Sequence, residues 1–146
     1  MASPQLQMAI DVMKAFGDKV GATLPEMRTA FEQMAAPAQP DIKTEKINAN
    51  GVDAEWVAAP GAASDRAVMY LHGGGYVLGS VNTHRDLLGR ISRAAQVRVL
   101  GLNYRLAPEN PFPAAVEDAL AGYRSCSTRA LSRRASPSRA IRPAAD

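Results

Sequence analysis

A glycine-rich segment, His72–Tyr76, is the part of this sequence whose residue types point most directly to chemistry. It follows the apolar run Ala67–Leu71, so the chain enters the glycines from a predicted β-strand. Glycines let a backbone turn sharply, and their N–H groups can point into a cleft unhindered by side chains. Such donors stabilise a carbonyl oxygen that becomes negative during acyl transfer, as in an oxyanion hole. Gly-rich turns after strands also bind phosphate or serve only as tight turns, so the segment alone leaves these alternatives open.

A second block, Asn103–Glu109, follows further along the chain, and Pro111–Ala119 then opens a predicted helix. Together with His72–Tyr76, these residues and their spacing resemble the hormone-sensitive-lipase-like branch of the α/β-hydrolase fold, a family of carboxylesterases and lipases. The resemblance covers roughly residues 1–124. It implies an α/β protein: the N-terminal portion of an α/β-hydrolase, in which a sheet with flanking helices is preceded by N-terminal cap helices. It also implies a small-molecule ester as the substrate of the intact family fold.

The resemblance assigns expected roles to the residues of the first block. Gly73 and Gly74 are expected to donate the oxyanion-hole hydrogen bonds through their backbone N–H groups, while Gly75 shapes the turn. His72 is expected to position this loop rather than to act as a base, because the catalytic histidine of the family lies far downstream. Tyr76 is expected either to line the acyl or alcohol pocket or to pack against the cap.

The second block is expected to support the first. Tyr104 belongs to it, and we expect Arg105 and Glu109 to pair with each other and to pin the loop near the glycine turn. Asp118, in the helix that follows, is expected to face solvent. His84, the other histidine of the chain, is predicted to cap a helix or to lie on the surface.

The elements that must position these residues follow from periodicity and turn residues. Apolar residues at helical spacing predict two N-terminal helices, Asn50-Gly51 predicts a hairpin turn, and the alternation of strand, loop, helix and strand predicts an α/β sheet. Val68–Leu71 is apolar enough to be buried in a parallel sheet. The predicted helices are 4–16, 25–34 and 84–95, the predicted strands are 42–47, 54–58, 68–71 and 97–102, and 35–40 is a linker.

Composition narrows the classes of protein. No apolar run approaches the roughly twenty residues that span a bilayer, and no targeting segment is recognisable, so we expect a cytoplasmic protein with no membrane partner. The single Cys126 excludes an internal disulfide, and two isolated histidines offer no metal site; we expect no cofactor. The formal charge of +3 arises in the tail, since five arginines and one acid lie from Ser125 onward.

The same tail lacks the rest of a serine esterase. The family mechanism needs a Gly-x-Ser-x-Gly elbow, an acid and a histidine, in that order, and none of the three is found in these 146 residues. Residues 125–146 are rich in Arg, Ser, Ala and Pro, and we expect them to be disordered. Regrouping plausible codons for Arg139–Asp146 in another frame yields Gly-Asp-Ser-Ala-Gly-Gly-Gly, which has the form of the missing elbow. The sequence therefore predicts cap helices over 1–40, half of a hydrolase core over 41–124, and a frame-shifted tail over 125–146.

The expected function is that of a carboxylic ester hydrolase for short or medium acyl esters, with this truncated chain inactive because the triad is missing. Two alternatives belong to other classes. One is a non-catalytic ligand-binding remnant. The other is contact with nucleic acid through the Arg-rich tail, which lacks aromatic residues and lysine, so no nucleic-acid partner is expected. The oligomeric state does not follow from the sequence.

Overall fold

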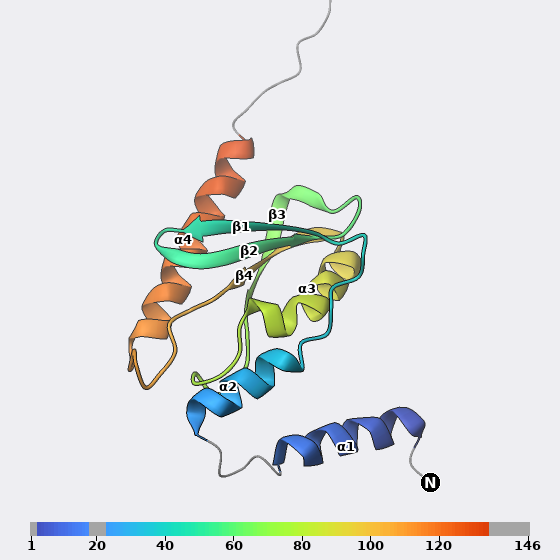
Figure 1. Cartoon of the computed structure of the whole chain (residues 1–146). Helices are drawn as coiled ribbons and strands as arrows, with labels where there is room; N and C mark the ends of the chain where they lie inside the picture. Colours follow the sequence, from blue (N-terminus) through green and yellow to red (C-terminus); the bar gives the residue numbers. More distant parts are fainter. Residues whose placement is uncertain (1–2, 18–22, 135–146) are drawn as a thin grey trace, which may run out of the picture.

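The computed structural model describes residues 3–17 and 23–134, which form a mixed sheet with helices on both of its faces (Figure 1). Most element positions agree with the sequence predictions. The helices are α1 (Pro4–Gly17), α2 (Leu24–Gln33), α3 (Val81–Ala95) and α4 (Ala114–Arg134), and the strands are β1 (Lys43–Ala49), β2 (Val52–Ala58), β3 (Ala63–Leu71) and β4 (Val97–Leu102).

The sheet has the order β1-β2-β4-β3. Strands β1 and β2 form the predicted hairpin, with Asn50 and Gly51 at its turn. Both have positive φ angles, 57° and 96°, which two-residue hairpin turns require. Strand β2 pairs antiparallel with β4. Strand β3 pairs parallel with β4, and α3 connects the two in the sequence. The α/β fold class is therefore confirmed.

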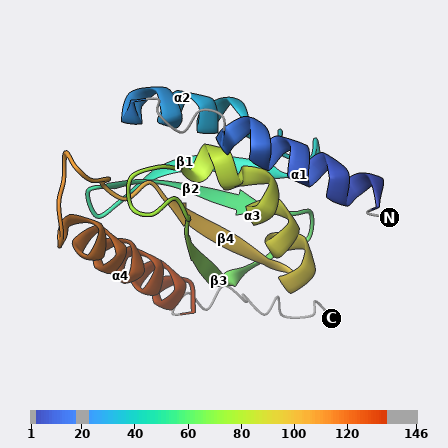
Figure 2. The same ribbon diagram turned by 90° about the horizontal axis from the view of Figure 1, so that it is seen from below.

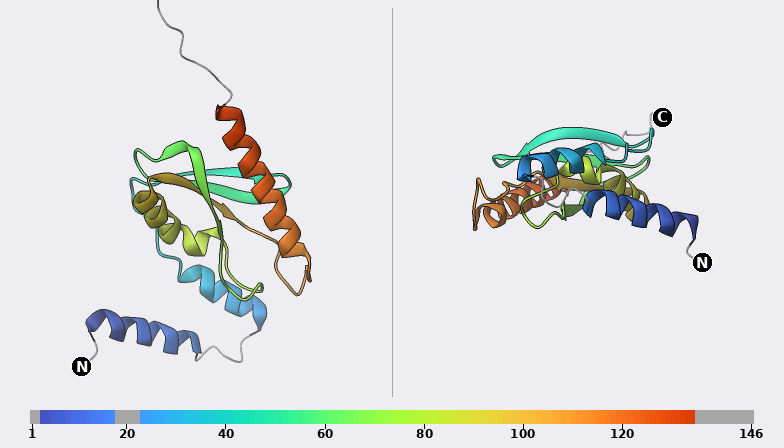
Figure 3. Two further views of the ribbon diagram at one scale, coloured as in Figure 1. Left: turned by 180° about the vertical axis from the view of Figure 1, so that it is seen from behind. Right: turned by 60° about the horizontal axis from the view of Figure 1, so that its bottom comes forward.

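Side chains alternate between the two faces of the sheet and give two apolar clusters. On one face, Trp56, Leu100 and Leu102 pack with Ala121 and Cys126 of α4. On the other face, Val57 and Val99 pack with Leu88 and Ile91 of α3. The figures show that α4 covers one face of the sheet. It lies behind the sheet in Figure 1 and in front of it in the left view of Figure 3, which is turned by half a turn.

Strand β3 differs from its prediction in two ways. It begins at Ala63 instead of Val68, because an irregularity between Ala63 and Ala67 accommodates the exposed polar residues there. It also lies at the edge of the described sheet, where Val68 is only half-buried and Leu71 is exposed. The expectation that this strand is buried in a parallel sheet is therefore wrong for the described structure.

The helices begin and end at residues set by local capping and composition. Helix α3 begins at Val81, ahead of the predicted His84, because Ser80 caps it: the Ser80 hydroxyl accepts from Thr83 N and the Thr83 hydroxyl accepts from Ser80 N. Helix α4 continues to Arg134 without a break at Ser125, since 125–134 contains neither Gly nor Pro. The expected disordered tail therefore overlaps the end of α4 over 125–134, and its remaining part, 135–146, lies outside the described residues.

The two N-terminal helices lie on one side of the molecule, as Figure 2 shows from below. Helix α2 lies beside α3 and is joined to it by a hydrogen bond from Asn82 Nδ2 to Glu32 Oε2 of 2.8 Å. Helix α1 lies farther from the sheet than α2 (Figure 1). Met8 in α1 and Met34 after α2 are exposed, so neither contributes to the core.

Candidate functional site

The glycine loop, defined here as residues 72–80, leaves β3 and returns the chain into α3. Its shape is fixed by Gly74, whose carbonyl accepts hydrogen bonds from Val77 N (3.1 Å) and Leu78 N (2.9 Å). Gly74 has a φ of 128°, and a Cβ there would lie 2.1 Å from the Leu78 carbonyl oxygen. Only glycine fits at this position. A Cβ added at Gly73, by contrast, would meet no other atom within 4 Å.

The N–H groups of Gly73 and Gly74 donate none of the backbone hydrogen bonds found among the described residues. Both glycines line a cavity of about 530 Å³ between the glycine loop and the start of α4. Its wall brings together all the predicted residues of the first block and one of the second. The lining residues are Leu71, His72, Gly73, Gly74, Gly75, Tyr76, Tyr104, Ala115, Val116 and Ala119.

His72 is buried at the root of the glycine loop, with 4% of its surface exposed. Its Nδ1 lies 2.9 Å from the Gly73 carbonyl oxygen; because a carbonyl only accepts, Nδ1 carries the proton. Nε2 is buried and has no hydrogen-bond partner among the described residues. Burial lowers the pKa of His72 below its ordinary value of 6.5, although the Gly73 carbonyl acts in the other direction.

Tyr104 supports His72 through its ring and its hydroxyl. The two rings stack with centroids 4.2 Å apart, and the Tyr104 hydroxyl donates a 2.5 Å hydrogen bond to the His72 carbonyl oxygen. Burial raises the pKa of Tyr104 above its ordinary value of 10.0, which keeps this donor protonated. These contacts join the second sequence block to the first.

His84 lies near His72, with ring centroids 5.7 Å apart. It is half-buried beside Phe31 and Tyr70 rather than on the surface, and it is not the helix cap, because Ser80 has that role. Its Nδ1 lies 2.9 Å from the Thr83 hydroxyl. The sequence expectation of a capping or surface residue was therefore wrong.

Tyr76 is 63% exposed and adopts a positive φ of 64°. It lines the main cavity and also a second one of about 310 Å³, which Phe112 and Pro113 help to form. Its side chain therefore lies at the boundary between two cavities.

Arg105 and Glu109 do not pair with each other, contrary to expectation. Arg105 binds Asp118, which accepts from Arg105 N at 2.8 Å and from Nε at 3.0 Å, and Arg105 also reaches the exposed Glu117. Asp118 is only 8% exposed, so the expectation that it faces solvent was wrong as well. Burial opposes ionisation of Asp118, but the hydrogen bonds from Arg105 prevail and lower its pKa below 3.8.

Glu109 instead binds Arg28 of α2, a residue that sequence reasoning missed. Arg28 Nη1 and Nη2 each lie 2.8 Å from one oxygen of the Glu109 carboxylate. These hydrogen bonds hold the pKa of Glu109 down at about 2. No local sequence pattern predicts this pair, because the two residues are far apart in the chain.

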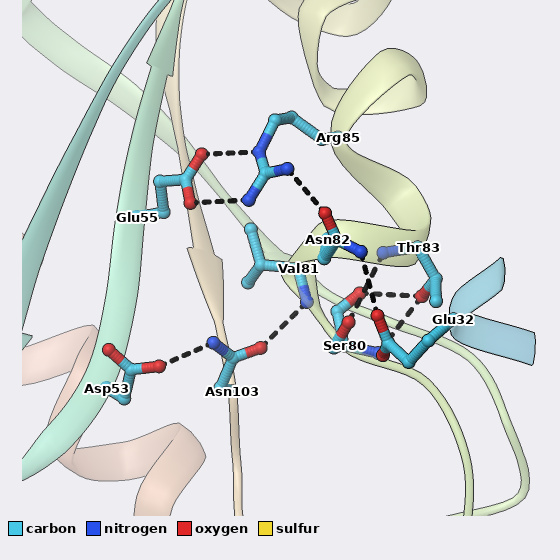
Figure 4. A network of polar contacts seen from close by, with 9 residues as sticks. All are labelled: Glu32, Asp53, Glu55, Ser80, Val81, Asn82, Thr83, Arg85 and Asn103. Carbon is cyan, nitrogen blue, oxygen red and sulfur yellow. Dashed lines mark hydrogen bonds and ion pairs between the residues drawn. The ribbon is translucent and has the colours of Figure 1, made fainter. Parts of the chain in front are cut away.

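A network of polar side chains fixes the end of the glycine loop at the start of α3 (Figure 4). Asn103, directly after β4, accepts a hydrogen bond from Val81 N (2.7 Å) and donates one to Asp53 (2.6 Å). Arg85 of α3 binds the buried Glu55 of β2 through two hydrogen bonds of 2.7 and 3.0 Å. The Arg85 pKa is raised by this partner. The loop therefore ends on a helix that is anchored to the sheet.

The described residues were also considered as possible metal ligands and membrane spans, and they provide neither. No group of three or more His, Cys, Asp or Glu side chains is placed to hold a metal ion in the described part. Among the described helices, none is both long and apolar enough to cross a membrane.

Comparisons with known proteins point to one family. The model of a family described as alpha/beta hydrolase fold matches residues 68–141. An acetyl-hydrolase of Streptomyces hygroscopicus is 38% identical over 127 residues, which cover 85% of this chain and 42% of that protein. A carboxylic ester hydrolase of Mycobacterium tuberculosis is 34% identical over 131 residues, covering 82% of this chain and 35% of that protein. A crystal structure of an esterase from the bacterial hormone-sensitive lipase family superposes with a TM-score of 0.83 at 48% identity, covering 95% of this chain and 46% of that one.

The chain therefore belongs to the α/β-hydrolase fold family, in its branch of bacterial hormone-sensitive-lipase-like esterases. It spans less than half the length of these relatives.

Proposed function

We propose that this chain carries the oxyanion-binding part of a carboxylic ester hydrolase, with the N–H groups of Gly73 and Gly74 as the donors. One observation supports this most. Two backbone N–H groups that have no acceptor among the described hydrogen bonds lie at the wall of a cavity large enough for a small ester. His72, Gly75, Tyr104 and Glu109 act by holding the loop.

The proposed substrates are esters with short or medium acyl chains. The cavity wall is largely apolar where Leu71, Ala115, Val116 and Ala119 line it, which suits an acyl chain beside the amide donors. Tyr76 separates this cavity from the second and would contact the acyl or alcohol group. EstE5 is a relative that is 48% identical to this chain over the matched region, and a crystal structure of it was obtained after soaking with p-nitrophenyl butyrate. This supports the substrate class.

We further propose that the chain by itself does not hydrolyse esters. Its 146 residues contain no Gly-x-Ser-x-Gly elbow, and an oxyanion hole without a nucleophile leaves only a small part of the rate enhancement. The frame-shift origin of 125–146 belongs to the same proposal. The cytoplasmic location and the absence of a cofactor remain predictions from the sequence.

Hydrolysis of p-nitrophenyl butyrate by the purified chain tests the proposal. We expect no release above that caused by a G74A variant, which cannot keep the loop geometry. Turnover at the rate of an intact esterase that G74A abolishes would contradict the proposed inactivity.

Sequencing the coding DNA from the Tyr123 codon onward tests the frame shift. A downstream frame that encodes the elbow, the acid and the histidine would support it, and restoring that frame should restore hydrolysis. If no such frame exists, the frame-shift proposal is wrong, and a ligand-binding remnant becomes the function to test.

A further inference from the structure

We propose that Arg28 of helix α2 is a positioning residue for the glycine loop, so that a helix outside the sheet sets the direction of the Gly73 and Gly74 N–H groups. The proposal deepens the function proposed above and takes its meaning for ester hydrolysis from it. Its structural part, the control of the loop by Arg28, stands on the contacts alone.

Arg28 joins three segments that are distant in the sequence. Its Nε donates to the Val77 carbonyl, in the glycine loop, at 2.8 Å. Its Nη2 donates to the Ala107 carbonyl at 2.8 Å, and the same guanidinium binds both oxygens of Glu109. The side chain is only 27% exposed, so several of these donors point into the protein. A guanidinium has donors in a rigid planar fork, and here that fork reaches two loops at once.

The loop depends on these contacts because they hold the peptide groups whose N–H groups bind the Gly74 carbonyl. The Gly74 carbonyl is held by two N–H groups, those of Val77 and Leu78. The peptide group that carries Val77 N–H has its oxygen bound by Ala107 N at 2.9 Å. The peptide group that carries Leu78 N–H has its oxygen bound by Arg28 Nε. Each peptide that fixes Gly74 is thus fixed in turn from outside the loop.

Arg28 acts on both of these outer anchors. It binds the Val77 carbonyl directly, and it binds the carbonyl of Ala107, whose N–H is the other anchor. The Glu109 carboxylate balances the charge of the guanidinium and keeps it in this orientation. Since Gly74 follows Gly73 directly, the orientation of the two proposed oxyanion donors depends on a contact made by α2.

A simpler role for Arg28 would be to attach α2 to the rest of the protein. The structure provides a control for this role, because Glu32 also attaches α2, through Asn82 of α3, without a hydrogen bond to the glycine loop. If attachment alone matters, loss of either contact should have the same effect on the loop. If Arg28 positions the loop, only loss of Arg28 should change it.

Amide hydrogen exchange of the full chain, read residue by residue by NMR, separates the two roles. In R28M, which keeps an unbranched side chain, although a shorter one, and removes its donors, the Val77, Leu78 and Ala107 amides should exchange about tenfold faster or more, as expected for loss of a charged donor. The amides of Val99 and Leu100 in β4 should be unchanged. R28K should be intermediate, because a single ammonium keeps the charge near Glu109 but cannot reach every acceptor. E32A should leave the three loop amides as in the wild type.

The chemical shifts of the Gly73 and Gly74 amides provide a second readout, expected to move in R28M and not in E32A. Loop amides within twofold of wild type in R28M, or equal acceleration in R28M and E32A, would overturn the proposal. Should R28M not fold, the comparison of R28K with E32A decides in the same way. None of these measurements uses an ester, so failure of the positioning role and failure of the proposed ester hydrolysis are separate outcomes.

Discussion

Gly74 and Gly73 are adjacent residues of the same type with opposite structural requirements. Gly74 has a positive φ, and its added Cβ would collide with the Leu78 carbonyl, whereas Gly73 meets neither restriction. We predict that Gly74→Ala lowers the free energy of unfolding by about 2 kcal/mol or more, because the backbone must move. Gly73→Ala should change it by less than about 0.5 kcal/mol. Urea unfolding of both variants measures the difference.

Equal effects of the two substitutions would contradict this account of the loop. Because each variant adds one methyl group, their comparison removes the general effect of replacing glycine. A stable Gly74→Ala variant would mean that the loop accommodates a side chain there by adopting another conformation.

At the same scale, His72 should show a distinct pH dependence. Its buried Nε2 has no hydrogen-bond partner among the described residues, so protonation would leave a charged donor unsatisfied there. Burial lowers the pKa of His72 below 6.5 in the folded chain. In the unfolded chain the ring takes up a proton near its ordinary pKa of 6.5. As pH falls below this value, the unfolded state binds more protons, so the free energy of unfolding should decrease until the folded pKa is reached.

NMR titration of the His72 ring checks this prediction, with a folded-state midpoint below 6.5 expected. Urea unfolding across the same pH range should show a smaller loss of stability on acidification in His72→Gln than in the wild type. A midpoint above 6.5 would show that the ring gains a partner when it is charged.

At the scale of elements, Asp118 joins the start of α4 to the segment that follows β4. It accepts hydrogen bonds from both the backbone and the side chain of Arg105, and it is buried. We predict that Asp118→Ala lowers the free energy of unfolding by about 1–3 kcal/mol, because a partly buried N–H loses its acceptor. Glu117→Ala, which removes the exposed partner of the same arginine, should cost less than about 1 kcal/mol.

Thermal or urea unfolding of the two variants, with the Arg105 N–H exchange rate as a local readout, tests this difference. Faster exchange of that amide in Asp118→Ala alone is the expected result. If Glu117→Ala is equally destabilising, the ion pair on the surface matters more than its exposure suggests.

The elements themselves were predictable to the extent that they follow from local patterns. Asn50-Gly51 determined the hairpin, and apolar periodicity located the helices, since both signals act over a few residues. The pairing of charges was not predictable. Arg28 and Glu109 are 81 residues apart in the sequence, so their pairing depends on the whole fold between them. Arg105 binds Asp118 instead of Glu109, which is closer in the sequence, because α4 places the Asp118 carboxylate beside it.

The position of β3 was missed for a reason that belongs to the whole molecule. Its sequence is that of a strand buried on both faces, yet in the described sheet it pairs only with β4. In the described sheet, the apolar run 67–71 therefore lies at an edge, although its pattern is that of a buried strand. The local sequence indicates how deeply a strand is suited to be buried, but it does not indicate which strands lie beside it.

This edge predicts how the molecule behaves in solution. Val116, Leu120 and Tyr123 are exposed on one side of α4, which packs beside β3, and Leu71 is exposed at the end of that strand. An unpaired strand edge next to an exposed apolar face promotes association.

We predict concentration-dependent self-association of the purified chain, measured by sedimentation velocity. Leu120→Lys should reduce it, whereas Ala94→Lys, which adds the same charge at an exposed position of α3, should not. A chain that stays monomeric over the full concentration range, or equal effects of the two lysines, would show that this face does not drive association.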